Sequence, residues 1–219
     1  MESNLKTVAI VSQKGGVGKT TLATGLAVAS ERAGQRTAIF DIDPQGSASF
    51  WNDTREAESP AVVAVPPVRL AHMLKAAAEA GTDLVIVDAP PVAKDIAFQA
   101  VENADFILIP TRPAVLDVMA ATETLKLIRR ASDPPKPAAV VITFCPPQGR
   151  EVGDTENAIK QLGALLAPIR IHNRVAYSRA QQTGLTATEF EPGGKAALEL
   201  QQLYEFLCMH LYSRSRRAA

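Results

Sequence analysis

The sequence contains little cysteine, and its two cysteines are not arranged to hold a metal. Cys145 and Cys208 are the only ones in a chain of 219 residues. Neither belongs to a CxxC pair or a Cys/His array, the usual patterns of zinc and Fe–S sites. A chain of this length can bury a core large enough to need no disulfide. We therefore expect two buried or half-buried thiols in a reducing compartment.

Long apolar runs and an excess of one charge are also missing. No run approaches the roughly 18 apolar residues of a membrane span, and residues 1–6 contain no apolar signal core. The 23 basic and 23 acidic residues give a formal net charge of +0. Contact with nucleic acid would therefore need a local basic patch. We expect a cytoplasmic protein that does not associate with membranes.

Short apolar runs alternate with helix-like segments along most of the chain. The runs are continuous rather than alternating, which is typical of parallel strands covered by helices on both faces. The expected strands are residues 7–12, 37–41, 62–65, 84–88, 106–110 and 138–144. The expected helices are residues 22–33, 68–80, 94–103, 115–130, 154–166 and 194–212.

This order predicts an α/β fold with one doubly wound, mostly parallel sheet and helices on both faces. No repeat, low-complexity tract or linker divides the chain, so we expect a single domain over residues 1–219. Residues 213–219 form a basic tail that we expect to be disordered.

A glycine-rich loop, K-G-G-V-G-K-T at residues 14–20, separates the first expected strand from the first expected helix. Backbone N–H groups and a helix N-terminus converge on an anion at such a position. Lys19 would reach the β- and γ-phosphates, and the Thr20 hydroxyl would ligate Mg²⁺. The strand before and the helix after disfavour the alternative, a glycine turn with two solvated lysines. The predicted nucleotide-binding residues are Lys14, Gly15, Gly16, Val17, Gly18, Lys19, Thr20 and Thr21.

The loop departs from the general pattern G-x-x-x-x-G-K-[ST], because Gln13 stands at its first position and Lys14 follows. In this it resembles the deviant Walker A motif of the ParA/MinD family of ATPases. The resemblance implies a P-loop NTPase that hydrolyses ATP with Mg²⁺ and forms a homodimer with ATP between the subunits. It also implies that Lys14 reaches the phosphates bound by the other subunit, where its charge would stabilise the transition state. Lys14, Lys19 and Asp43 are then the expected catalytic residues.

Residues 40–46, F-D-I-D-P-Q-G, resemble the second motif of the same family. The resemblance assigns Asp43 to orienting the attacking water and to the metal site. Asp41 would support either the Mg²⁺ shell or the loop. The composition of residues 43–46 also favours a simple turn, and a turn is compatible with that role.

Residues 85–90, V-I-V-D-A-P, resemble a Walker B element, an apolar strand that ends in an aspartate. There Asp88 would hold Mg²⁺ through a water molecule and complete a metal site with Thr20 and Asp43. A strand-ending aspartate is often only a helix cap, which is the alternative. The segments that follow Asp43 and Asp88 are candidate switch segments.

The resemblance becomes less specific in the last third of the chain. Residues 171–189 look like the family's late strand, loop and return, which lie near the adenine and the dimer edge. Thr143 and residues 144–150 are further candidates for contact with the base, and the sequence does not choose among them.

ParA proteins bind DNA without sequence preference when ATP joins them as dimers. The resemblance therefore implies DNA-binding cations in the second half of the chain, and a solvated face is the alternative. The candidates are Arg170, Arg174, Arg179, Lys195 and, in the tail, Arg214, Arg216 and Arg217.

The chain is most like the small ParA partition ATPases, because the first strand is expected almost at once. This implies a nucleoid-associated ATPase whose hydrolysis is stimulated by a ParB-like or centromere-binding protein or another cargo adaptor. The cargo stays open among a plasmid, a chromosome, a chemoreceptor cluster and a carboxysome.

Two alternatives remain. A MinD-like membrane-cycling ATPase would need an amphipathic C-terminal segment. The apolar residues within 198–212 are more simply explained by a helix packed on the core. A metabolic or redox enzyme on the same scaffold would need cluster cysteines or a small-substrate site, and neither is found in the sequence.

Overall fold

The computed structural model describes residues 5–91 and 93–212. Its strands form one seven-stranded sheet in the order β3-β2-β4-β1-β5-β6-β7, and every neighbouring pair is parallel. The strands are β1 Lys6–Ile10, β2 Thr37–Asp41, β3 Ala61–Ala64, β4 Leu84–Asp88, β5 Phe106–Thr111, β6 Ala138–Cys145 and β7 Leu165–His172. The predicted doubly wound α/β fold is confirmed.

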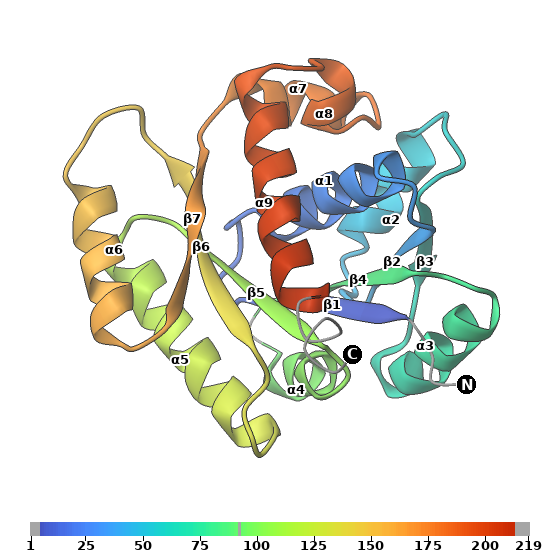
Figure 1. Cartoon of the computed structure of the whole chain (residues 1–219), viewed down its shortest axis with the longest axis horizontal. Coiled ribbons are helices and arrows are strands. Elements are labelled where there is room, and N and C mark those ends of the chain that lie inside the picture. Colours follow the sequence, from blue (N-terminus) through green and yellow to red (C-terminus); the bar gives the residue numbers. More distant parts are fainter. Residues whose placement is uncertain (1–4, 92, 213–219) are drawn as a thin grey trace.

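Helices cover both faces of the sheet (Figure 1). One face carries α1 Lys19–Arg32, α2 Ser47–Thr54, α7 Val175–Gln182, α8 Ala187–Phe190 and α9 Lys195–Tyr212. The other carries α3 Leu70–Glu79, preceded by the short 3₁₀ helix η1 Pro67–Arg69, then α4 Lys94–Glu102, α5 Val115–Ala131 and α6 Glu151–Gln161. Successive strand residues point to opposite faces, so Val8 and Ile10 join the first layer and Ala9 joins the second.

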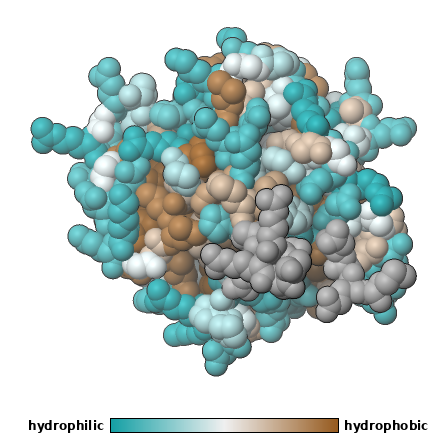
Figure 2. Space-filling view, in the orientation of Figure 1, coloured by the Kyte–Doolittle hydropathy of each residue, from teal (hydrophilic) through white to brown (hydrophobic). Residues whose placement is uncertain are grey.

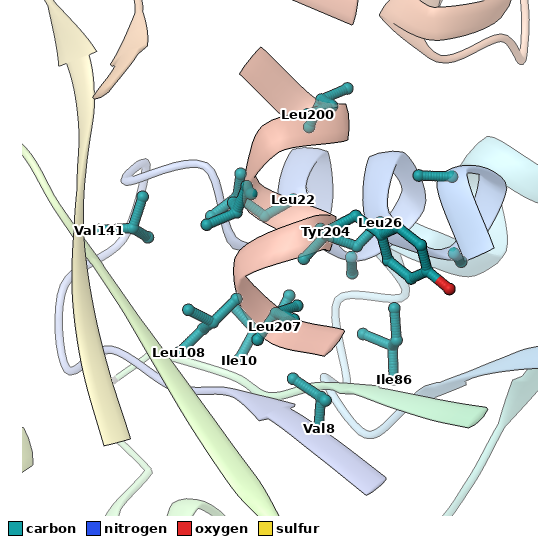
Figure 3. Close-up of a cluster of buried hydrophobic side chains, with 14 of the residues drawn as sticks. Val8, Ile10, Leu22, Leu26, Ile86, Leu108, Val141, Leu200, Tyr204 and Leu207 are labelled. Carbon is teal, nitrogen blue, oxygen red and sulfur yellow. The ribbon is translucent and has the colours of Figure 1, made fainter. Parts of the chain in front are cut away.

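Helices α1 and α9 lie side by side over the centre of the sheet. Figure 3 shows Leu22 and Leu26 of α1 beside Leu200 and Leu207 of α9. Gly25 permits this close approach, because a Cβ atom there would lie 2.7 Å from Leu200 Cδ2. The helix that begins at the glycine-rich loop is thus held firmly against the last helix of the fold.

Five elements differ from the prediction. The helix expected at residues 154–166 begins earlier and ends at Gln161, because Gly163 turns the chain with φ of +67° and Leu165 enters β7. Strand β7 lies at the edge of the sheet and is broken in sequence by Pro168, so it lacks the continuous apolar run of the central strands. Helices α2, α7 and α8 lie where the sequence indicated only loops.

Several smaller expectations are confirmed. Cys145 is buried and Cys208 half-buried, as expected. Trp51 is also buried, and its indole N–H donates to Leu185 O at 3.2 Å. Helix α9 buries most of its apolar side chains, although Leu198 stays exposed.

The outer surface is mostly polar. Figure 2 shows hydrophilic side chains over most of one face, with a hydrophobic area where α9 meets β6 and β7. Over the part of the chain that the structure describes, no helix combines the length and apolarity needed to cross a membrane.

Candidate nucleotide site

The glycine-rich loop follows β1, a central strand that pairs with β4 on one side and β5 on the other. Ligands of open α/β sheets bind at the carboxyl ends of strands where the winding changes direction. Gly18 is the N-cap of α1 with φ 89° and ψ 23°, a left-handed conformation that glycine adopts without strain. No side chain of the described residues caps α1, so its first N–H groups can serve a ligand.

Lys19 lies inside this loop rather than in solvent. Its residue exposure is 8% and its ammonium is 3.5 Å from Lys14 O. Burial lowers the pKa of Lys19, while the charges of Asp88 and Asp43 act in the opposite direction. A buried ammonium that faces an open cavity is suited to an anionic ligand, which would restore the favourable surroundings of its charge.

Asp88 ends β4 and is fully buried beside the loop. Its Oδ2 accepts a 2.7 Å hydrogen bond from Thr20 Oγ1, and its Oδ1 has no partner among the described residues. Burial raises the pKa of Asp88 to about 7, against the Thr20 hydrogen bond, which lowers it. A hydroxyl next to an incompletely satisfied carboxylate fits Mg²⁺, which prefers oxygen ligands and keeps several waters.

The two aspartates after β2 have different surroundings. Asp41 is buried and accepts hydrogen bonds from Ser49 N and Oγ, both at 3.0 Å, and from Asp43 N at 3.1 Å. It therefore organises the β2–α2 loop, one of its two expected roles. Asp43 Oδ1 accepts from Gln45 N at 2.9 Å, and its side chain lines the cavity over the glycine-rich loop. Asp43 thus takes part in a turn and also faces the cavity, so the turn is compatible with the predicted functional role.

Two adjoining cavities lie over the loop. The larger, of about 720 Å³, contains Lys19, Thr20 and Asp43 in its lining. The smaller, of about 200 Å³, lies between the loop, the end of β6 and the β7–α7 segment. Gly18, Thr21, Phe144, Ser178 and Gln181 line both of them. One ligand could therefore extend from the larger cavity into the smaller.

The smaller cavity brings together the segments that the sequence could not rank for base contact. Its lining includes Thr143 and Phe144 from the end of β6 and Ile171 to Val175 after β7. Thr143 Oγ1 also donates to Val17 O at 2.9 Å, which ties β6 to the glycine-rich loop. Gln181 Nε2 donates to Thr21 Oγ1 at 2.9 Å, which ties α7 to α1.

Lys14 lies apart from the other predicted catalytic residues. Its ammonium is 3.4 Å from Asp117 Oδ2 on α5, and the same carboxylate binds Arg112 Nε at 2.9 Å. Lys14 is not among the described residues that line the larger cavity, although Gly15 and Gly16 are. Asp117 was not predicted, because its only local signal is that of an acid in the first turn of a helix.

The four predicted DNA-contacting residues fall into two pairs. Arg170 Nε binds Glu156 Oε1 at 2.7 Å, and Arg174 binds Glu199 Oε1 at the same distance through Nη2. Arg179 and Lys195 are exposed, and neither forms an ion pair with any other described residue. Arg214, Arg216 and Arg217 lie outside the described residues.

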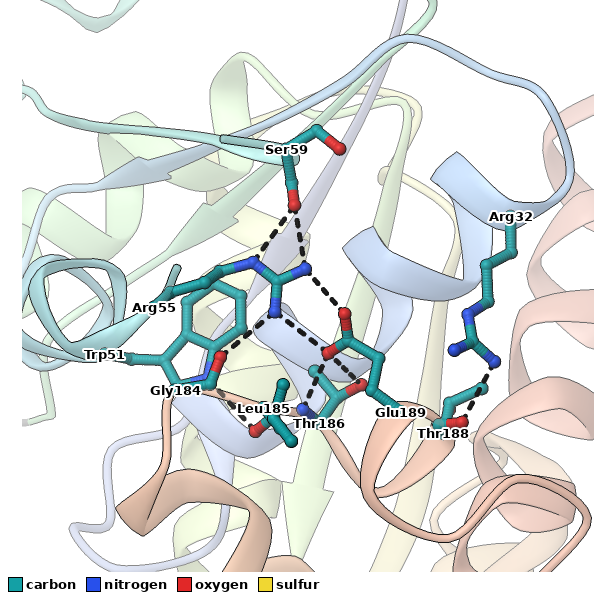
Figure 4. Close-up of polar contacts among 9 residues, drawn as sticks. All are labelled: Arg32, Trp51, Arg55, Ser59, Gly184, Leu185, Thr186, Thr188 and Glu189. Carbon is teal, nitrogen blue, oxygen red and sulfur yellow. Dashed lines mark hydrogen bonds and ion pairs between the residues drawn. The ribbon is translucent and has the colours of Figure 1, made fainter. Parts of the chain in front are cut away.

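A second network of polar contacts that was not predicted links the segments behind the far wall of the larger cavity (Figure 4). The Arg55 side chain is 4% exposed and binds Glu189 Oε1 at 2.6 Å, Gly184 O at 3.0 Å and Ser59 O at 2.8 Å. Its guanidinium also lies 4.8 Å from the centre of the Trp51 ring. Because α2 and α7 both line the larger cavity, this network fixes the separation of its walls.

Histidine and cysteine contribute no further metal site. Within residues 5–91 and 93–212, no group of three or more His, Cys, Asp or Glu residues is placed to hold a metal. His172 instead lies 2.8 Å from Glu199, and His210 lies against Phe206 and Phe106.

Comparisons with known proteins agree with this geometry. Residues 8–188 match the family described as the CobQ/CobB/MinD/ParA nucleotide binding domain. The maintenance of carboxysome distribution protein A of Halothiobacillus neapolitanus is 31% identical over 202 residues, covering 88% of this chain and 91% of that protein.

Among solved structures, apo McdA from Cyanthece superposes with a TM-score of 0.79 at 21% identity, covering 93% of this chain and 99% of the other. The septum site-determining protein MinD of Pyrococcus horikoshii OT3, complexed with Mg-ADP, has a TM-score of 0.74 at 17% identity. The superposition covers 93% of this chain and 96% of the MinD chain. At these identities the superpositions establish the fold.

Proposed function

Since the chain belongs to the CobQ/CobB/MinD/ParA nucleotide-binding family, we propose that it is a Mg²⁺-dependent ATPase whose ATP-bound dimer positions a cargo. The family resemblance seen in the glycine-rich loop is thereby confirmed. The observation that carries the proposal is the buried Lys19 next to the Thr20–Asp88 hydrogen bond. The Lys19 ammonium and the helix N–H groups then face one cavity, and the under-satisfied Asp88 carboxylate lies directly behind Thr20 in its wall, as a nucleoside triphosphate with Mg²⁺ requires.

The predicted site residues in and behind the wall of the larger cavity have distinct roles in this proposal. Lys19 and the N–H groups of residues 15–21 bind the phosphates. Thr20, Asp88 and Asp43 hold Mg²⁺, which when bound neutralises charge on the phosphates. Asp43 also orients the attacking water, because its carboxylate is half-exposed and lies on the cavity wall. The base and ribose occupy the smaller cavity.

Hydrolysis requires a second subunit in this proposal. Lys14 is bound to Asp117 within its own chain, and its side chain is still 33% exposed. We propose that it exchanges this partner for the phosphates of the second subunit when ATP joins two copies. ATP binding then depends on the buried Lys19 of one subunit, whereas catalysis also needs the exposed Lys14 of the other. Turnover is therefore coupled to dimerisation.

The dimer would bind DNA without sequence preference and release it after hydrolysis. Among the four candidate cations, Arg179 and Lys195 suit phosphate contact best, because Arg170 and Arg174 are engaged by carboxylates. The cargo would be carried by an adaptor protein that stimulates hydrolysis. One relative is named for carboxysome distribution, which supports keeping a protein assembly beside a plasmid or chromosome among the candidate cargoes.

Three measurements on purified protein test the proposal. Wild type should hydrolyse ATP with Mg²⁺, form dimers at saturating Mg-ATP by light scattering, and bind random duplex DNA at low salt only with ATP. Lys19→Ala should lose ATP binding, whereas Lys14→Ala should bind ATP but lose turnover. A wild-type protein that stays monomeric with Mg-ATP, or a Lys14→Ala variant with normal turnover, would refute the dimer mechanism.

A further inference from the structure

One buried carboxylate of α9 organises the polar wall of the smaller cavity. Glu199 has a residue exposure of 7% and accepts hydrogen bonds from three side chains. They are His172 Nδ1 at 2.8 Å, Arg174 Nε at 2.8 Å and Tyr177 Oη at 3.0 Å. The His172 backbone N–H and Arg174 Nη2 add contacts at 3.2 and 2.7 Å. Glu199 is therefore saturated by donors from the β7–α7 segment.

All three partner side chains belong to residues that line the smaller cavity, whereas Glu199 does not line it. Its effect on a ligand would thus be exerted through His172, Arg174 and Tyr177. Helix α9 is itself fixed against α1 by the close contact of Leu200 with Gly25. The position of this wall relative to the glycine-rich loop, which leads into α1, is therefore fixed.

The charges of this cluster make Glu199 difficult to replace by a neutral residue. A buried carboxylate is stabilised only when it is paired, and the Arg174 fork binds it through both Nε and Nη2. Burial and the neighbouring Glu199 both raise the pKa of Tyr177, so its hydroxyl remains a donor at neutral pH. Without Glu199, Arg174 would be unpaired and Tyr177 would have only Ala196 O, at 3.2 Å, as an acceptor.

We propose that Glu199 is a positioning residue for the nucleoside end of the substrate. It holds Arg174 and Tyr177 where the base and ribose contact them, so it contributes to affinity for the nucleoside but not for the triphosphate. This inference rests on the proposed ATPase function. It also assigns Arg174 to the nucleotide pocket rather than to the DNA surface.

The test compares two ligands, Mg-ATP and Mg-tripolyphosphate, by titration calorimetry of the full chain. Glu199→Ala should weaken ATP binding about tenfold or more, because Arg174 and Tyr177 would lose the group that holds them in place and would have to be ordered when the nucleoside binds. Its affinity for tripolyphosphate, which has no nucleoside, should stay within about twofold. Glu199→Gln keeps the volume and one acceptor and should show a smaller loss. Glu205→Gln, an exposed change on the same helix, is the matched control.

The outcomes separate this inference from the ATPase proposal. Wild type that binds neither ligand would refute the ATPase proposal itself. Equal loss of both ligands in Glu199→Ala would show that the residue only supports the fold, and unchanged ATP affinity would show that it does not position the nucleoside. Should Glu199→Ala not fold, Arg174→Ala carries the same test, with the ATP-selective loss expected and an equal loss overturning the inference.

Discussion

Asp88 is expected to destabilise the protein when no metal or nucleotide is bound, and Asp88→Asn tests this directly. The carboxylate is 1% exposed, and Oδ1 has no partner among the described residues. Burial is the main reason that its pKa rises from 3.8 to about 7. The folded protein therefore resists ionising a group that ionises readily in the unfolded chain.

The sign of the pH dependence follows from this shift. Well below pH 3.8 the carboxyl is protonated in both states and has no effect. As the pH rises from about 4 to about 7, the unfolded chain loses the proton and the folded chain keeps it, so stability falls. A shift of this size corresponds to an upper limit of ~4 kcal/mol above pH 8. An asparagine NH₂ buried beside Lys19 would offset part of the gain.

We therefore expect Asp88→Asn to stabilise the ligand-free protein by about 2 kcal/mol at pH 8, or roughly 4–8 °C in Tm. At pH 5 the gain should nearly vanish, because the penalty of Asp88 falls by about 2–3 kcal/mol between pH 8 and pH 5 and the cost of burying the asparagine NH₂ cancels what remains. Thermal unfolding in EDTA, followed by circular dichroism at both pH values, measures this. Asp53→Asn, at an exposed position, should change stability by no more than about 0.5 kcal/mol.

Either of two results would contradict the reasoning. A gain of the same size at pH 5 and pH 8 would mean that ionisation of Asp88 is not the cause. A loss at pH 8 would mean that the carboxylate is better accommodated than its burial indicates. Adding Mg-ATP should stabilise wild type more than Asp88→Asn, since the variant lacks the proposed metal ligand.

Three further predictions concern the walls of the larger cavity. Gly184→Ala should destabilise the protein by about 2 kcal/mol or more, because Gly184 has φ +66° and a Cβ atom would lie 2.5 Å from Arg55 Cα. Urea titration measures this, and Gly153→Ala, where no atom lies within 4 Å of the added Cβ, is the control and should gain up to about 1 kcal/mol. Glu189→Gln should cost about 3 kcal/mol at pH 7, because it leaves Arg55 unpaired. Burial raises the pKa of Glu189, but hydrogen bonds from Arg55 and Thr186 outweigh burial, so the pKa is lowered overall. The stability difference between wild type and Glu189→Gln should therefore shrink as the pH falls below 4.5. A stability difference that stays constant with pH would contradict this reasoning. Asp43→Ala should bind Mg-ATP and accumulate as a dimer in light scattering, and normal hydrolysis by this variant would remove Asp43 from the role of orienting water.

The central part of the fold could be read from the sequence because its signals are local. Continuous apolar runs such as residues 84–88 indicate strands buried on both faces, and β4 has those bounds. The glycines of residues 15–18 indicate a loop that folds around an anion, and Gly18 does cap α1. Only the end of the edge strand β7 coincides with the late strand that the resemblance indicated from residue 171, and the rest escaped because it is only partly buried and contains Pro168. The short helices α7 and α8 escaped because each buries only one small apolar residue, Ala180 and Ala187, and so has no apolar stripe in the sequence.

The amino-acid sequence by itself determined that Lys19, Thr20, Asp43 and Asp88 come together, because parallel strands bring their carboxyl ends to one edge of the sheet. Only the tertiary structure decided that Asp117 holds Lys14 and that Glu199 holds Arg174. It also decided that Asp88 is buried deeply enough for its pKa to reach about 7. Contacts between distant segments, and the exclusion of water around a charge, depend on how whole layers pack, and no local pattern of residues records them.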